Sequence, residues 1–162
     1  MKNVKRISAA VILLAASVPV YAQWSDTGQL QVNGNMPLIT ELQIEDLGVT
    51  LDLSDAAADV HIATVRERSN STTGYQITIT SANGGELQHS SGQGSLPYTL
   101  EYGAGNQIDL TTGGSISNSN VTPAQGLSRD VLVSHGTGDA TSGDILPEGS
   151  YQDTLTFTIS AE

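Results

Sequence analysis

Apolar and polar side chains alternate with a period of two through most of this chain. In residues 75–80 and 155–159, for example, every second side chain is aliphatic or aromatic, and threonine fills many positions between. Side chains of a β-strand alternate between its two faces, so this spacing is typical of half-buried strands, whereas a helical period is nearly absent. The pattern predicts an all-β protein. Its expected strands are residues 29–38, 47–53, 60–65, 75–80, 96–102, 131–133 and 151–159.

Glycine, asparagine and serine punctuate the expected strands. Asn83-Gly84 is a strong tight-turn signal. Short strands separated by such turns favour one β-sandwich domain. Residues 111–125 are polar and low in complexity, which predicts a long surface loop, and residues 54–59 predict one helical turn with Ser54 as its N-cap.

The N-terminus has the composition of a secretory signal peptide. Lys2, Lys5 and Arg6 precede the apolar residues 7–20, and Ala22 closes a stretch suited to signal peptidase. The apolar stretch is shorter than the roughly 20 residues of a membrane-spanning helix. We therefore expect a signal peptide at residues 1–22, cleavage after Ala22 and export.

The expected mature chain is strongly acidic. It keeps all 17 acidic residues but only three basic ones, Arg66, Arg68 and Arg129, which gives a net charge of −14. Such a surface repels nucleic acid and anionic lipid, so neither is expected as a partner. We interpret the acidity as an aid to solubility. The chain has no cysteine, which excludes disulfides and thiolate sites.

The two ends of the mature chain are informative together. After a polar lead at residues 23–28, the next segment places side chains of one parity at Leu30, Val32, Gly34 and Met36. The C-terminal strand alternates through Leu155, Phe157 and Ile159.

A last strand at a sheet edge leaves unpaired backbone groups beside an apolar slot. An alternating extension from an identical molecule can fill such a slot. Burying Leu30, Val32, Met36 and Leu38 would contribute on the order of 6–12 kcal/mol. Ordering the segment costs about 1–2 kcal/mol per residue and offsets much of this gain. The alternative is that residues 29–38 form the first strand of their own sandwich.

Several short runs resemble one family of pilins. Residues 28–39, followed by Leu42-Gln43, resemble the N-terminus of major subunits of the alternate chaperone–usher fimbriae, the colonization-factor-antigen type. Residues 146–155 are similar to the closing turn and final strand of that family and of spore-coat-U-like pilins of the archaic chaperone–usher class, and residues 96–103 are also similar. The absence of cysteine fits the alternate class and departs from the archaic class.

The resemblance implies an incomplete immunoglobulin-like β-sandwich that is completed by donor-strand exchange with the next copy. It implies a periplasmic chaperone and an outer-membrane usher as partners, and a place in a cell-surface fimbrium that serves adhesion or biofilm formation. Residues 23–37 would be the donor extension and residues 38–162 the pilin-like domain. Leu38 is left out of the donor role because Pro37 interrupts backbone donation there. The implied donor residues are Leu30, Val32, Gly34 and Met36, and the acceptor-edge residues are Leu155, Phe157 and Ile159.

A second hypothesis is a self-contained secreted β-sandwich that binds a glycan or calcium. Asp139, Asp144 and Glu148 lie among glycines, but the ligand spacing of a recognised calcium loop is missing, which favours a solvated turn. No nucleophile elbow or phosphate loop occurs, so we expect neither an enzyme nor a cofactor. The histidines also lack metal-ligand spacing: His61, His89 and His135.

Overall fold

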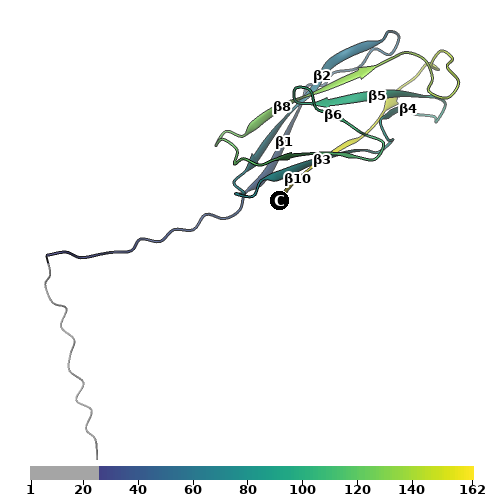
Figure 1. Ribbon diagram of the computed structural model, residues 1–162. Helices are drawn as coiled ribbons and strands as arrows, with labels where there is room; N and C mark the ends of the chain where they lie inside the picture. The colour runs from purple at the N-terminus through teal and green to yellow at the C-terminus, as the bar shows by residue number, and fades with distance from the viewer. Residues whose placement is uncertain (1–25) are drawn as a thin grey trace, which may run out of the picture. The chain divides into compact units, whose positions relative to one another are not determined.

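The computed structural model describes residues 26–162. The expected signal peptide and its cleavage site lie outside these residues. The chain divides into two units, and the second unit, Met36–Glu162, is called the body below. Every regular secondary-structure element of the described residues is a β-strand, as the sequence predicts (Figure 1). In this part of the chain no helix is long and apolar enough to cross a membrane.

The strands of the body form two antiparallel sheets that pack as a sandwich. The larger sheet has the order β1-β2-β8-β5-β4-β9, with β6 also paired to β5, and the smaller has the order β10-β3-β7. The strands are β1 (Thr40–Asp46), β2 (Ala57–Ser69), β3 (Tyr75–Ser81), β4 (Glu86–His89), β5 (Ser95–Tyr102), β6 (Gln107–Ile108), β7 (Gly114–Asn118), β8 (Leu127–His135), β9 (Tyr151–Gln152) and β10 (Leu155–Ala161).

The core lies between the sheets and follows from the alternation. Val65 of β2 and Leu100 of β5 are fully buried from the larger sheet, and Ile77 and Ile79 of β3 are buried from the smaller one. The residues between them along each strand point away from the core, so one alternating pattern specifies both the strand and its buried face.

A buried polar network joins the two sheets. Glu67 of β2 has no exposed surface, and its carboxylate accepts hydrogen bonds from Tyr75 Oη at 2.6 Å and Tyr102 Oη at 2.6 Å. Arg129 Nε of β8 donates a third bond to Glu67 at 2.8 Å and forms an ion pair with it. Tyr75 belongs to the smaller sheet and the other three residues to the larger sheet, so the carboxylate links the layers.

These buried tyrosines predict a loss of stability in alkali. Burial, with the hydrogen bond to Glu67, raises the pKa of Tyr75 to about 12, and burial also raises the pKa of Tyr98 and Tyr102. Unfolded tyrosines ionise near pH ~10. Above that pH the unfolded chain has lost protons that the folded chain retains, so the free energy of unfolding falls as the pH rises toward about 12. Urea unfolding between about pH 8 and about pH 11 should show a falling midpoint; a constant midpoint would contradict this account.

Two local predictions are wrong. Residues 54–59 form no helical turn, because β2 begins at Ala57 and a register shift follows between Ala57 and Val60, where Asp59 has a φ of 54°. Residues 111–125 are not one long loop either. They contain β7, in which Ile116 packs against the core between two exposed serines.

The predicted strand at residues 47–53 is also absent. Asp46 Oδ1 accepts a hydrogen bond from Gly48 N at 2.8 Å, and Asp52 Oδ1 accepts bonds from Ser54 N at 3.0 Å and Ser54 Oγ at 2.7 Å. Such local turns compete with strand pairing. The segment therefore runs beside the sandwich without joining either sheet.

The two ends of the body hold different loops. β1 begins at Thr40 opposite Ser69, and the loop of residues 119–126 is tied to Ser69 at this end by the bond from Thr122 N to Ser69 O at 2.9 Å. We call this the proximal end; β10 also ends here, near the C-terminus (Figure 1). The opposite, distal end holds the loops of residues 47–56 and 136–150.

Candidate functional site

An open groove of ≈ 1270 Å³ lies between the edge strands β1 and β10. Ile44 of β1 lines one side of it, together with residues 49–54. Leu155 and Phe157 of β10 line the other side, and residues 143–153 close the distal part. The groove is larger than the about 300–1000 Å³ of a usual small-molecule pocket.

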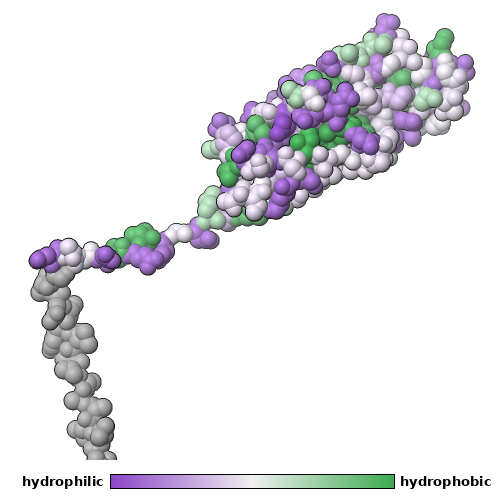
Figure 2. Space-filling model, in the orientation of Figure 1, coloured by the Kyte–Doolittle hydropathy of each residue, from purple (hydrophilic) through white to green (hydrophobic). Residues whose placement is uncertain are grey.

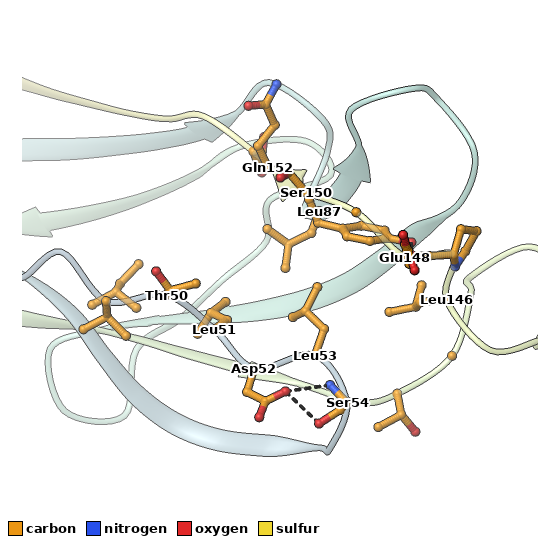
Figure 3. A pocket seen from close by; sticks show the side chains of 18 of the residues that line it. Thr50, Leu51, Asp52, Leu53, Ser54, Leu87, Leu146, Glu148, Ser150 and Gln152 are labelled. Carbon is orange, nitrogen blue, oxygen red and sulfur yellow. Dashed lines mark hydrogen bonds between the residues drawn. The ribbon is translucent and has the colours of Figure 1, made fainter.

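The interior of the groove is apolar and its rim is polar. Figure 3 shows Leu51, Leu53, Leu87 and Leu146 turned toward the space between the two walls. All four are partly buried, and Leu51 and Leu87 pack against the core. The groove is therefore an extension of the hydrophobic core that opens to solvent.

Backbone edges flank the groove. In the part of the chain that the structure describes, β1 pairs only with β2, and β10 only with β3. An edge strand leaves every second backbone N–H and C=O group without a ladder partner. β1 and β10 approach to within 8 Å between some Cα atoms. A strand paired to both needs about 9.5 Å between them, so the two edges must separate where they are closest.

The predicted acceptor-edge residues face the inside of the sandwich. Leu155 and Phe157 line the groove, and Ile159 lies on the same side of β10 and packs against the core. All three are only partly buried, whereas Ile77 and Ile79 of the neighbouring strand β3 are fully covered. The inner face of β10 thus keeps apolar surface in contact with solvent.

The predicted donor residues are in solvent. Leu30 is 88% exposed, Val32 85% and Met36 68%, and a Cβ added at Gly34 would meet no described atom within 4 Å. Figure 2 shows the apolar surface of this segment. Residues 26–39 belong to no strand, so the alternative prediction that residues 29–38 form the first strand of this sandwich is wrong. The first strand begins at Thr40.

The connector to β1 is anchored by one side chain that the sequence did not single out. Asn70 Nδ2 donates to Pro37 O at 2.8 Å, and Asn70 Oδ1 accepts from Ile39 N at 2.7 Å. The backbone of Asn70 also donates to Ile39 O at 3.2 Å. Residues 37–39 are therefore fixed to the proximal end of the body. Leu38 between them is 62% exposed.

In the acidic loop that was considered for calcium, the carboxylate of Asp139 is occupied by hydrogen bonds from backbone N–H groups. Asp139 Oδ1 accepts hydrogen bonds from Thr141 N at 2.9 Å and Ser142 N at 2.8 Å, and Asp139 Oδ2 accepts one from Ser95 N at 2.8 Å. These bonds, that of Ser142 foremost, lower the pKa of Asp139 below its usual range. Asp139 holds the loop against the start of β5.

The histidines lie apart from one another. His61 is in β2 with its Nε2 3.4 Å from Asp130, His89 is in β4, and His135 is buried at the end of β8. Residues 26–162 contain no cluster of three or more His, Asp or Glu side chains that could hold a metal ion.

Comparison with known proteins identifies no family. The chain matches no protein-family model, and no match to a curated protein was found. The class that fold and site define is an all-β protein of two antiparallel sheets with an open apolar groove between two sheet edges.

Proposed function

We propose that this chain is a structural subunit of a bacterial surface fimbria and polymerises by donor-strand exchange. Residues 29–36 of one copy fill the groove of the next. One observation carries the proposal: the same chain exposes an alternating apolar segment and an apolar groove between two unpaired sheet edges. Monomeric soluble proteins rarely expose large apolar patches, which instead mark sites of association.

A strand placed in the groove resolves both exposures at once. Its backbone would pair with β1 and β10, and Leu30, Val32 and Met36 would cover the apolar side chains that these strands leave in solvent. No contact within the described chain requires a glycine at position 34. In the groove, the missing side chain would let the donor backbone approach the groove wall most closely at Gly34.

The route to the fibre rests on the resemblance to chaperone–usher pilins. A subunit with an open groove of this kind would aggregate in the periplasm, because its exposed sheet edges would pair with those of other molecules. In this proposal a periplasmic chaperone covers the groove after export, and an outer-membrane usher exchanges the chaperone for the donor segment of the next subunit. The fibre at the cell surface then serves adhesion or biofilm formation.

Val32→Asp should abolish polymerisation, whereas Asn33→Asp should not. The two variants add the same charge to neighbouring residues, but residues 32 and 33 of an extended strand face opposite sides. A carboxylate at position 32 would be buried in the apolar groove, and one at position 33 would face solvent. The measurement is the yield of multimers that resist SDS until heated, from cells that supply the chaperone and usher.

Equal yields from the two variants would contradict the proposal. A stable, fully monomeric wild-type protein under the same conditions would also contradict it, and would favour a self-contained sandwich. Chaperone binding should persist in both variants, because it uses the groove rather than the donor segment.

A further inference from the structure

Residues 37–39, the connector between the donor segment and β1, are too few to keep adjoining copies apart. This inference rests on the proposed function. Met36 is the last donor position and Thr40 the first residue of β1. An extended chain spans at most ~3.6 Å per residue, so these two residues lie no more than about 14 Å apart. Asn70 holds the connector on the proximal end. Filling the groove therefore brings the proximal end of the donating copy against the accepting copy.

The contact falls on the distal end of the accepting copy. The proximal end of the accepting copy is already occupied by that copy's own connector, which leads to its own donor segment and so to the next copy in the fibre. A donor that leaves at the distal end runs antiparallel to β10, which starts distally at Leu155 and ends proximally at Ala161. Each contact then joins unlike ends, and such a head-to-tail contact gives an open filament.

The distal end presents an apolar side chain between acids. Ile145 is 94% exposed, and Asp144 and Glu148 beside it are also exposed. The loop is held in place by the bond from Asp139 N to Asp144 O at 2.9 Å. Figure 2 shows hydrophobic surface at this tip of the body. No Arg of the described residues lies in either distal loop.

The proximal end presents the complementary surface. A hollow of ≈ 510 Å³ lies between β1, β2 and residues 124–125, and Leu42, Arg66, Arg68 and Gln125 are among the residues that line it. Arg68 pairs with Glu41 at 2.6 Å. Arg66 is exposed and has no ion pair within the described chain. These two are the exposed cations of an otherwise acidic body.

We propose that the loop of residues 144–148 of the accepting copy docks in this hollow of the donating copy. Ile145 packs on the aliphatic parts of Arg66 and Arg68, which lie on the outer face of β2, and the carboxylates of Asp144 and Glu148 face the guanidinium groups. The partner is a second copy of this chain. The contact adds an electrostatic joint beside the donor strand, and it relieves the repulsion between acidic subunits.

Crosslinking tests the contact cleanly because the chain has no cysteine of its own. A variant with Ile145→Cys and Gln125→Cys, assembled into fibres and treated with a short bis-maleimide, should give a ladder of multimers that survives heating in SDS. The matched control carries Ile145→Cys with Gln107→Cys. Gln107 is exposed on β6 and lines neither the groove nor the hollow. It should give heat-labile multimers and no ladder.

Failure of this contact is distinguishable from failure of the proposed function. Heat-labile multimers without a ladder from the 125/145 pair would overturn the contact and leave donor-strand exchange standing. Absence of multimers from the unmodified chain would overturn both. Arg66→Glu in the crosslinking variant should reduce the ladder several-fold, and adding Asp144→Arg should restore it. A ladder unchanged by Arg66→Glu would overturn the electrostatic part.

Discussion

Appending residues 23–38 after Glu162 through a short Gly/Ser linker is expected to raise the melting temperature of the mature chain by roughly 10 °C or more. The appended segment would start at the proximal end, beside the end of β10, and could run directly into the groove. Burial of Leu30, Val32 and Met36 contributes roughly 1.5–3 kcal/mol each, and pairing with β1 and β10 adds to it. Tethering keeps the segment at a high effective concentration, which reduces the cost of binding it.

The same variant should no longer polymerise, because its groove is already filled. Differential scanning calorimetry and the yield of SDS-resistant multimers measure the two effects. The control appends the same segment with aspartate in place of Leu30 and Val32; it matches the test variant in length and linker. An equal melting temperature for the two appended chains would show that the groove does not bind the segment.

The sequence predicted the all-β class because alternation alone specifies a strand and its buried face. It succeeded where aliphatic residues alternate with threonine, as in β3 and β10, whose partners pair residue by residue from Leu155 opposite Ser81 to Ala161 opposite Tyr75. It failed where strands carry small or polar residues. β7 reads Gly-Ser-Ile-Ser-Asn and shows one apolar side chain, and its pairing with β3 comes from long-range packing that no local pattern encodes.

Residues 29–38 and 47–53 show the opposite limit. Both alternate as well as the true strands do, yet neither pairs within the described chain. Alternation signals that one face is to be buried, and it carries no information on which molecule buries it. The groove was also invisible in the sequence, because it is built from five strands, β1, β2, β4, β9 and β10, and two loops that are far apart along the chain. Only Leu155 and Phe157 of its lining were predicted, from their place at the C-terminal edge.

Glu67→Ala is expected to lower the free energy of unfolding by about 3–5 kcal/mol, the usual cost of removing one partner of a buried ion pair. The substitution leaves Arg129, which is only 20% exposed, without its counter-ion. It also takes the acceptor from two buried tyrosine hydroxyls, and so breaks the polar link between the sheets. The chain has no cysteine, so no disulfide replaces this link.

Glu41→Ala is the matched control, because Glu41 also pairs with an arginine of the same sheet. Its partner Arg68 lies at 2.6 Å, but the two side chains are 58% and 45% exposed, and exposed pairs contribute about 0–1 kcal/mol. Tyr75→Phe removes the cross-sheet hydrogen bond to Glu67, and with it the bond that Tyr75 Oη accepts from Asn118 Nδ2 at 3.0 Å; losing the bond to the charged group should cost roughly 1.5–3 kcal/mol. Urea unfolding of the three variants measures the order. An equal loss of unfolding free energy for Glu67→Ala and Glu41→Ala would show that burial does not increase the contribution of the Glu67 carboxylate to stability. The two sheets would then be held together by apolar packing alone.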